Sequence, residues 1–276
     1  MNASEIVADR LIQRGIYLER YKAGLNIKIL AELEKLEDGL TQELAKAFAV
    51  KIANPTIRIR QLETLLSDTR RVIREVYRQA DKQSGDEMAR LAKNEQLFVV
   101  NAINDATVIE TAFSALNYDQ LKKLTDTTLI EGAPSSDWWA RQRDDVRRRF
   151  EDQMRMGVMR SEPLSDLVAR VRGTQEKAYT DGIMQVSKRQ AQALVRTSVQ
   201  AVANSTRNEV FAANPEVIRA IQWLSTLDSR TTRICMALSG KLWTTEGHKP
   251  IGHALPYPGP TAHWACRSTQ VAVLKK

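Results

Sequence analysis

Residues 187–207, SKRQAQALVRTSVQAVANSTR, contain the most informative helical pattern in the chain. Ser187 and Gln190 have capping-box spacing, so we expect a helix that begins at Ser187. It should end near Asn214 and Pro215, because proline does not continue a helix. Small and apolar side chains recur at steps of three and four, which puts them on one face suited to close packing; they are Ala191, Leu194, Val195, Ser198, Ala201, Val202 and Ser205.

Short strands are expected after Pro215. Residues 220–225 and 268–274 have the apolar and β-branched composition typical of strands. The loop between them is rich in glycine, proline and histidine. We therefore predict a small sheet with irregular connections that leans on the Ser187 helix.

Long helices are expected upstream. Apolar residues from Ile27 to Ala47 follow helical steps within residues 26–50. Asn54 and Pro55 then look like an N-cap and a first-turn proline. A break near Ser84 and Gly85 separates this second helix from a third over residues 86–116. These helices predict either an antiparallel bundle or an extended arm.

The stretch Gly132-Ala133-Pro134-Ser135-Ser136 is the clearest linker. Asp137 should then cap a charged helix to about Met156, whose buried side we expect to comprise Trp138, Val146, Phe150 and Met154. The predicted organisation is a helical arm or bundle at 1–131, a linker at 132–136 and a module at 137–276. In that module we expect helices at 137–213 and a sheet with a Cys/His loop at 217–276. The fold class is mainly α with a small C-terminal α+β module.

Composition limits the cellular setting. Hydrophobic residues make up 43% of the chain and charged residues 27%, which is ordinary for a soluble protein. No stretch approaches the roughly 20 apolar residues of a membrane span, and the first 15 residues lack the apolar core of a signal peptide. We therefore expect a protein without a membrane partner, made in a cytoplasm, with its two cysteines reduced.

Positive charge is concentrated at the C-terminal end. The formal net charge is +8, and the residues from Val217 onward carry eight bases and two acids. Such a surplus can attract nucleic acid without sequence preference or an acidic protein face, or it can be a solvated surface with no specific role.

The segment from Leu194 to Leu274 resembles the C-terminal module of Mu F-like phage head morphogenesis proteins. The matching pieces occur in order over roughly 80 residues, and the segment from Trp139 to Val171 resembles the upstream region of the family. The pieces are Val195-Arg196-Thr197, Trp223, Leu227 to Thr231, Cys235, Leu238 to Lys241 with Gly240, and Pro258, Gly259, His263, Cys266, Arg267 and Ser268.

This resemblance implies a bacteriophage minor capsid protein that acts in head morphogenesis and is not an enzyme. It implies a virion protein of few copies near the portal vertex, assembled in the host cytoplasm. The portal protein is the expected partner, and a major capsid or scaffold protein and packaged DNA are further ones. A part in DNA ejection belongs to the same expectation.

The family pattern often has two Cys-x-x-Cys-like pairs, and this sequence keeps one cysteine of each pair, Cys235 and Cys266. Thr232 and Ser268 stand where further cysteines can occur. A four-cysteine zinc site is therefore excluded here.

Cys235, His263 and Cys266 are the cluster with metal-ligand chemistry. His-x-x-Cys spacing allows two ligands from one turn, and Cys235 could supply a third to a structural zinc. His248, His253 or Asp228 would then have to be the fourth. We expect instead two buried thiols beside a hydrogen-bonded histidine, with no cofactor, and keep the structural zinc and a disulfide as the alternatives.

Asp228 and Arg230 flank a turn directly after the first predicted strand. An aspartate there can accept backbone N–H bonds and can also meet the guanidinium of Arg196 or Arg267. We expect these four residues to form a structural clasp.

Two other classes of function remain open. A loop with histidines, an aspartate and a basic surface could belong to a metal-dependent nuclease, although such sites favour adjacent carboxylates or a tight His-Asn-His arrangement. From Val217 onward the acids are Asp228 and Glu246, and there is no asparagine. The third class is a DNA-binding adaptor unrelated to phage.

Overall fold

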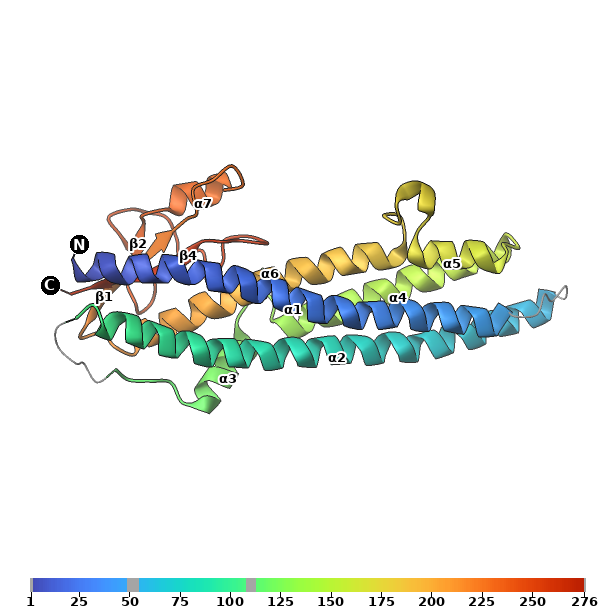
Figure 1. Ribbon diagram of the computed structural model, residues 1–276, viewed down its shortest axis with the longest axis horizontal. Helices are drawn as coiled ribbons and strands as arrows, with labels where there is room; N and C mark the ends of the chain where they lie inside the picture. The colour runs from blue at the N-terminus through green and yellow to red at the C-terminus, as the bar shows by residue number, and fades with distance from the viewer. Residues whose placement is uncertain (1, 49–54, 108–112, 276) are drawn as a thin grey trace. The chain divides into compact units, whose positions relative to one another are not determined.

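The computed structural model describes residues 2–48, 55–107 and 113–275 (Figure 1). Long helices dominate these residues, and a small antiparallel sheet follows near the C-terminus, which confirms the predicted fold class. The elements are α1 (Ala3–Phe48), α2 (Pro55–Asn104), α3 (Tyr118–Thr127), α4 (Ser135–Met159), α5 (Leu164–Arg172), η1 (Gln175–Lys177), α6 (Ile183–Ala212), β1 (Ile218–Leu224), α7 (Arg233–Leu238), β2 (Leu242–Trp243), β3 (Pro250–Ile251) and β4 (Thr269–Leu274).

The chain divides into two compact units, each built from several stretches. Unit 1 comprises residues 1–25, 85–135 and 194–276, and unit 2 comprises residues 26–84 and 136–193. Neither unit coincides with the predicted segments 1–131 and 137–276, because α1, α2 and α6 each contribute to both units.

Unit 1 is built around the second half of α6 and the sheet. The strand order is β3-β2-β1-β4 with antiparallel neighbours, and Ile221 of β1 faces Ala272 of β4. From Leu194 to Asn204 the helix is buried on nearly every side, with Arg196 as the exposed exception. One core joins α1, α2, α6 and the sheet; its buried members are Val7, Leu11, Val99, Ile103, Val210, Phe211, Ile218, Ile221, Val271, Ala272 and Leu274.

The two ends of the chain lie next to each other in unit 1 (Figure 1). The backbone N–H of Leu274 in β4 donates to Ser4 Oγ near the start of α1, at 2.9 Å. The first turns of α1 therefore take part in the same core as the last strand.

Unit 2 consists of helices packed along a leucine-rich face. α1 and α2 supply Leu33, Leu36, Leu40, Leu44, Leu62, Leu65, Leu66 and Ile73, and α4 supplies Trp139, Val146, Phe150 and Met154. The rings of Tyr77 and Trp139 meet edge to face with centroids 6.3 Å apart. Trp139 rather than the predicted Trp138 is the buried tryptophan of α4, and Trp138 is half-buried beneath the guanidinium of Arg141.

Several predicted helix limits are wrong. α2 continues through Ser84 and Gly85, where a break was expected, and it ends at Asn104 rather than near Leu116. α1 begins at Ala3 and leaves Ile27 exposed, because its buried line runs through Leu25 and Ile29 instead. The predicted N-cap Asn54 lies outside the described residues.

Two helices also begin earlier than predicted. α6 begins at Ile183, a turn before Ser187, and α4 begins at Ser135 inside the predicted linker. That linker starts as a tight turn in which Ile130 and Ala133 exchange backbone hydrogen bonds. Within the described ranges, no helix is long and apolar enough to cross a membrane.

Candidate functional site: a Cys-His-Cys cluster beside an ion-pair clasp

The connection between β1 and β4 folds over a small core of its own. Trp223, Cys235, Leu238, Trp243 and Cys266 are buried together there. The indole N–H of Trp223 donates to Ser225 Oγ at 3.1 Å. The connection therefore has buried aromatic support for the two cysteines.

Gly240 returns the chain from α7 to the sheet. Its φ of 81° lies in the left-handed region that favours glycine. Its N–H donates to the carbonyl of Trp223 at 2.8 Å. This bond between the two motif residues holds the chain that follows α7 against β1.

Cys235 is positioned by the first turn of α7. Thr232 is the N-cap, and its Oγ1 accepts from Cys235 N at 3.3 Å. Cys235 Sγ lies 3.1 Å from His263 Nε2 and 3.8 Å from Cys266 Sγ. Residues more than 25 positions apart in the chain are therefore brought together as the sequence predicts.

His263 and Cys266 come from a single turn before β4. Cys266 N donates to the carbonyl of His263 at 3.2 Å. Between them Ala265 has a φ of 57°, and its N–H donates to Oγ1 of the buried Thr197 on α6 at 3.0 Å. The second ring nitrogen of His263 lies 2.8 Å from the carbonyl of Trp264. These bonds fix the turn on α6 and orient the imidazole toward Cys235.

The two thiols have opposite acid–base tendencies. The hydrogen bond from Cys266 lowers the pKa of Cys235 against the effect of burial. The hydrogen bond to Cys235, followed by burial, raises the pKa of Cys266. The surrounding protein groups therefore favour a state in which one of the two cysteines is deprotonated over a state in which both are.

None of the predicted fourth ligands joins this cluster in the described part of the chain. His253 Nε2 lies 2.9 Å from the carbonyl of Leu242, and His248 stacks on Tyr257 with ring centroids 4.0 Å apart. Asp228 is bound by arginine. The group with metal-ligand geometry is thus Cys235, His263 and Cys266, whose ligand atoms lie within 4.8 Å of one another.

Asp228 pairs with Arg267 rather than with Arg196. Arg267 Nη1 donates to Asp228 Oδ2 at 2.8 Å and Nη2 donates to Oδ1 at 2.6 Å, a bidentate pair. Asp228 Oδ1 also accepts from Arg230 N at 2.9 Å, which closes the turn, and the Arg230 guanidinium is 3.6 Å from Oδ2. Bonding to Arg267 holds the pKa of Asp228 well below its usual range.

Arg196 is exposed on α6, and no hydrogen bond or ion pair among the described residues joins it to Asp228. The predicted four-residue clasp therefore contains three of its members. Its side chains are partly open to solvent, with 35% exposure for Asp228 and 23% for Arg267.

A polar line on α6, which sequence analysis did not include in the site, anchors the connection from beneath. Gln200 Nε2 and Asn204 Nδ2 donate to the carbonyl of Ser268 at 3.0 and 3.1 Å. Gln200 Oε1 accepts from the buried Lys22 Nζ at 2.9 Å, and burial lowers the pKa of Lys22. Gln200, Asn204 and Arg207 follow one another at steps of four and three, which places them on one face of the helix, and this polar spacing is the sequence pattern that could have predicted the anchor.

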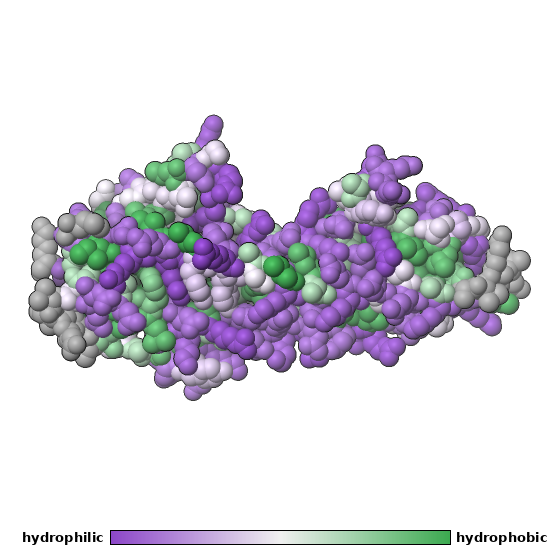
Figure 2. Space-filling view, in the orientation of Figure 1, coloured by the Kyte–Doolittle hydropathy of each residue, from purple (hydrophilic) through white to green (hydrophobic). Residues whose placement is uncertain are grey.

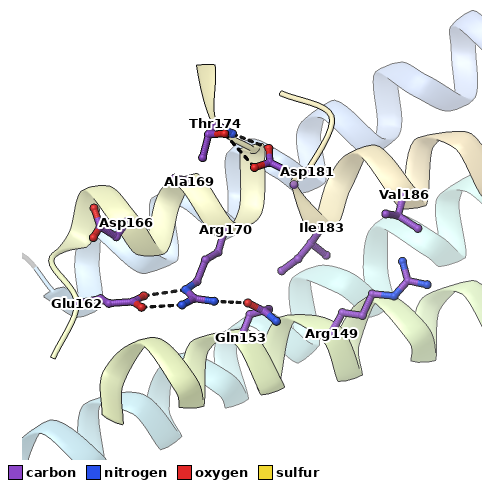
Figure 3. Close-up of a pocket in the computed structure, with 11 residues that line it drawn as sticks. Arg149, Gln153, Glu162, Asp166, Ala169, Arg170, Thr174, Asp181, Ile183 and Val186 are labelled. Atoms are coloured by element: carbon purple, nitrogen blue, oxygen red, sulfur yellow. Dashed lines mark hydrogen bonds and ion pairs between the residues drawn. The ribbon is translucent and has the colours of Figure 1, made fainter. Parts of the chain in front are cut away.

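A separate pocket of about 670 Å³ lies in unit 2 (Figure 3). Arg170 makes two hydrogen bonds to Glu162, at 2.7 and 2.6 Å, and also binds Gln153. Asp181 accepts from the N–H and hydroxyl of Thr174 at 2.8 and 2.9 Å. In this pocket Glu162 and Arg170 are thus engaged with each other, and Asp181 is engaged with Thr174.

Comparison with known proteins agrees with the sequence motifs. Residues 148–271 match the model of the family described as Phage Mu protein F like protein. No curated protein and no solved structure matches the chain. The matched residues run from the second half of α4 through α5, α6 and the Cys-His-Cys cluster into β4. The resemblance is therefore confirmed over residues 148–271, which are similar to phage Mu protein F like protein.

Proposed function

We propose that this chain is a minor capsid protein of a tailed bacteriophage and associates with the portal protein during head assembly. The observation that carries the proposal is the match of residues 148–271 to phage Mu protein F like proteins, which indicates a bacteriophage head-morphogenesis protein. The portal vertex of the virion is the proposed location, with assembly in the host cytoplasm. Major capsid or scaffold protein is a further proposed partner.

A structural role is favoured over an enzymatic one by the way the polar groups of the connection are used. Asp228 is engaged by Arg267 and by the Arg230 N–H. His253 and His248 pack on Trp243 and Tyr257. A nuclease site would need carboxylates free to bind a metal beside these histidines. The proposal therefore assigns no catalytic residue.

We propose that the portal contact includes the exposed apolar side chains at the start of the connection. Leu227 is 70% exposed, Ile234 55% and Met236 50%. Apolar residues are visible at the surface over α7 among mostly hydrophilic neighbours (Figure 2). Several exposed large apolar side chains within one short segment are typical of protein interaction surfaces.

Co-purification with the portal protein at moderate salt tests this function. The full chain should retain the portal oligomer, and Ile234→Asp with Met236→Asp should weaken retention. Tyr118→Asp is a matched control, because Tyr118 is 69% exposed in the first turn of α3, away from α7 in the sequence. Absence of portal from the wild-type eluate, and of the chain from procapsids, would reject the proposal.

A further inference from the structure

We propose that Cys235, His263 and Cys266 hold one zinc ion through three protein ligands, with the fourth position filled by solvent beside Thr232. This inference concerns the stability of the connection between β1 and β4, and it does not depend on the proposed portal association. It rests on ligand geometry, on the anchoring of each ligand and on the surrounding charge.

The separations of the ligand atoms suit a tetrahedral zinc site. With Zn–S bonds of about 2.3 Å, two tetrahedral thiolates lie about 3.8 Å apart. Cys235 Sγ and Cys266 Sγ are 3.8 Å apart. A thiolate and an imidazole nitrogen would lie about 3.6 Å apart, and the corresponding distance from Cys235 Sγ to His263 Nε2 is 3.1 Å. The three ligand atoms all lie within 4.8 Å of one another, so a movement of the half-buried histidine ring would bring Nε2 to the distance that a shared zinc ion requires from both sulfurs.

The imidazole is already oriented as a zinc ligand. A metal-bound histidine usually donates its other ring N–H to a carbonyl or carboxylate, which fixes the tautomer. His263 Nδ1 lies 2.8 Å from the carbonyl of Trp264, so Nδ1 can carry the proton and leave Nε2 the lone pair that would bind metal. Nε2 is the atom that faces Cys235 Sγ and Thr232 Oγ1.

The three ligands are held by two separately anchored parts of the backbone. The N-cap of α7 positions Cys235, and the turn bonded to Thr197 of α6 positions His263 and Cys266. Ligands fixed in advance reduce the entropy lost when metal binds. Zinc would then connect α7 directly to the turn before β4.

Charge around the cluster suits two thiolates bound to a divalent cation. The ammonium of Lys22 and the guanidinium of Arg267 are close enough to Cys266 to interact with it electrostatically. Both cations favour a negative sulfur, and a zinc ion with two thiolates has no net charge. The two cations are in turn balanced by Glu19 and Asp228.

Thr232 marks the fourth position. Its Oγ1 is 2.9 Å from His263 Nε2, so a donor at this residue lies within the same cluster. A neutral hydroxyl is a poorer zinc ligand than a thiolate, which leaves the place to water. Thr232→Cys should therefore complete a closed four-ligand site and retain zinc longer against a chelator than the wild type.

Metal analysis of the purified full chain tests the site. The wild type is loaded with zinc in the presence of a phosphine reductant, and unbound metal is then removed by gel filtration. It should retain about one zinc per chain, as structural zinc sites do. Cobalt substituted for zinc should give the thiolate charge-transfer band and intense visible bands of a tetrahedral site. X-ray absorption should report two sulfur neighbours and lighter donors.

Zinc affinities of single-residue variants distinguish residues that bind the metal from residues that only lie near it. Losing a group that merely hydrogen-bonds a ligand typically weakens metal binding about 10–100-fold, so His263→Gln and Cys235→Ser should each weaken it by more than that. His248→Gln is the matched control from the same connection and should bind like the wild type. Circular dichroism checks that each variant is folded.

The proposal is overturned if the folded wild type retains no zinc and its cobalt complex lacks the thiolate band. A chain without metal whose mass is lower by two hydrogens under non-reducing conditions would instead identify a disulfide. Equal metal binding by His263→Gln and His248→Gln would also overturn it. These outcomes are independent of portal binding, so this inference and the proposed function can fail separately.

Discussion

The side chains of Arg207 on α6 and Glu95 on α2 are both fully buried, and Arg207 Nε donates to Glu95 Oε1 at 2.7 Å. Arg14 of α1 reaches the other carboxylate oxygen at 3.1 Å, and Arg207 also binds the hydroxyl of Thr269. One buried carboxylate thus joins three helices of unit 1, and the arginine extends the network to β4.

Removing the Glu95 charge should destabilise unit 1 strongly. Glu95→Gln leaves the guanidinium of Arg207 without its charged partner inside the protein, which typically costs about 3–5 kcal/mol. Urea unfolding followed by circular dichroism measures the loss. The control is Asp105→Asn in the exposed Arg10–Asp105 pair, where at most about 1 kcal/mol is expected. Similar small losses for both variants would contradict the buried network.

The clasp should show a distinct pH dependence. Arg267 lowers the pKa of Asp228, so the folded chain keeps this carboxylate ionised where the unfolded chain, with a pKa of about 3.9, begins to bind a proton. The stability contributed by the clasp is therefore fully present above about pH 5 and is lost as the pH falls toward the folded pKa.

The melting temperature of Asp228→Asn, compared with the wild type, measures this contribution. We expect a decrease at about pH 7 that shrinks near pH 3, and it should be smaller than for Glu95→Gln because the clasp is partly exposed. Glu246→Gln should have little effect at either pH. Arg196→Ala should also have little effect, whereas Arg267→Ala should match Asp228→Asn. A pH-independent difference would argue against the clasp.

Gly85→Ala tests the continuity of α2. Gly85 is exposed in mid-helix, and a Cβ there would have nothing within 4 Å. Alanine in a helix interior is more favourable than glycine by about 0.5–1 kcal/mol, so this substitution should raise the free energy of unfolding by that amount. Gly182→Ala is the contrasting variant, because its Cβ would lie 2.4 Å from the Arg172–Gly173 backbone. A decrease for Gly85→Ala would indicate the break that the sequence predicts.

The sequence predicts well which segments are helices and which are strands, because the spacing of apolar residues reflects which face of each element is buried. The α6 pattern and the strands on either side of the connection are confirmed. The break at Gly85 was wrong because the cost of one glycine is small beside the burial along a 50-residue helix. Ser187 was misread as a cap because inside α6 its hydroxyl donates to the Ile183 carbonyl instead.

Site residues were harder to assign because their pairing depends on tertiary orientation. From the sequence, Arg196 and Arg267 are equally plausible ion-pair partners of Asp228. The orientation of α6 about its axis exposes Arg196, and Arg267 is the arginine that binds Asp228. The proximity of Cys235 to Cys266 was predicted, because the sequence groups both cysteines with His263 as residues of metal-ligand chemistry in one small module. The buried partner of Arg207 lies 112 positions away, and no local pattern pointed to Glu95.

DNA binding is expected to be weak and salt-dependent. The residues from Val217 onward carry a surplus of six positive charges, which can neutralise phosphates and release counterions. Fluorescence anisotropy with a random duplex should show affinity at low salt that falls steeply as salt is raised. Lys241→Gln with Lys249→Gln should weaken binding to every duplex sequence alike. Affinity that is unaffected by salt would contradict this prediction.

The most direct test of the head-assembly role is quantitative mass spectrometry of purified virions and of heads without tails. The proposed function predicts peptides of this chain in both particles, at a few copies per portal and far below the major capsid protein. Infection with a phage lacking the gene should yield defective heads. Absence of the chain from virions, tailless heads and procapsids alike would contradict the account.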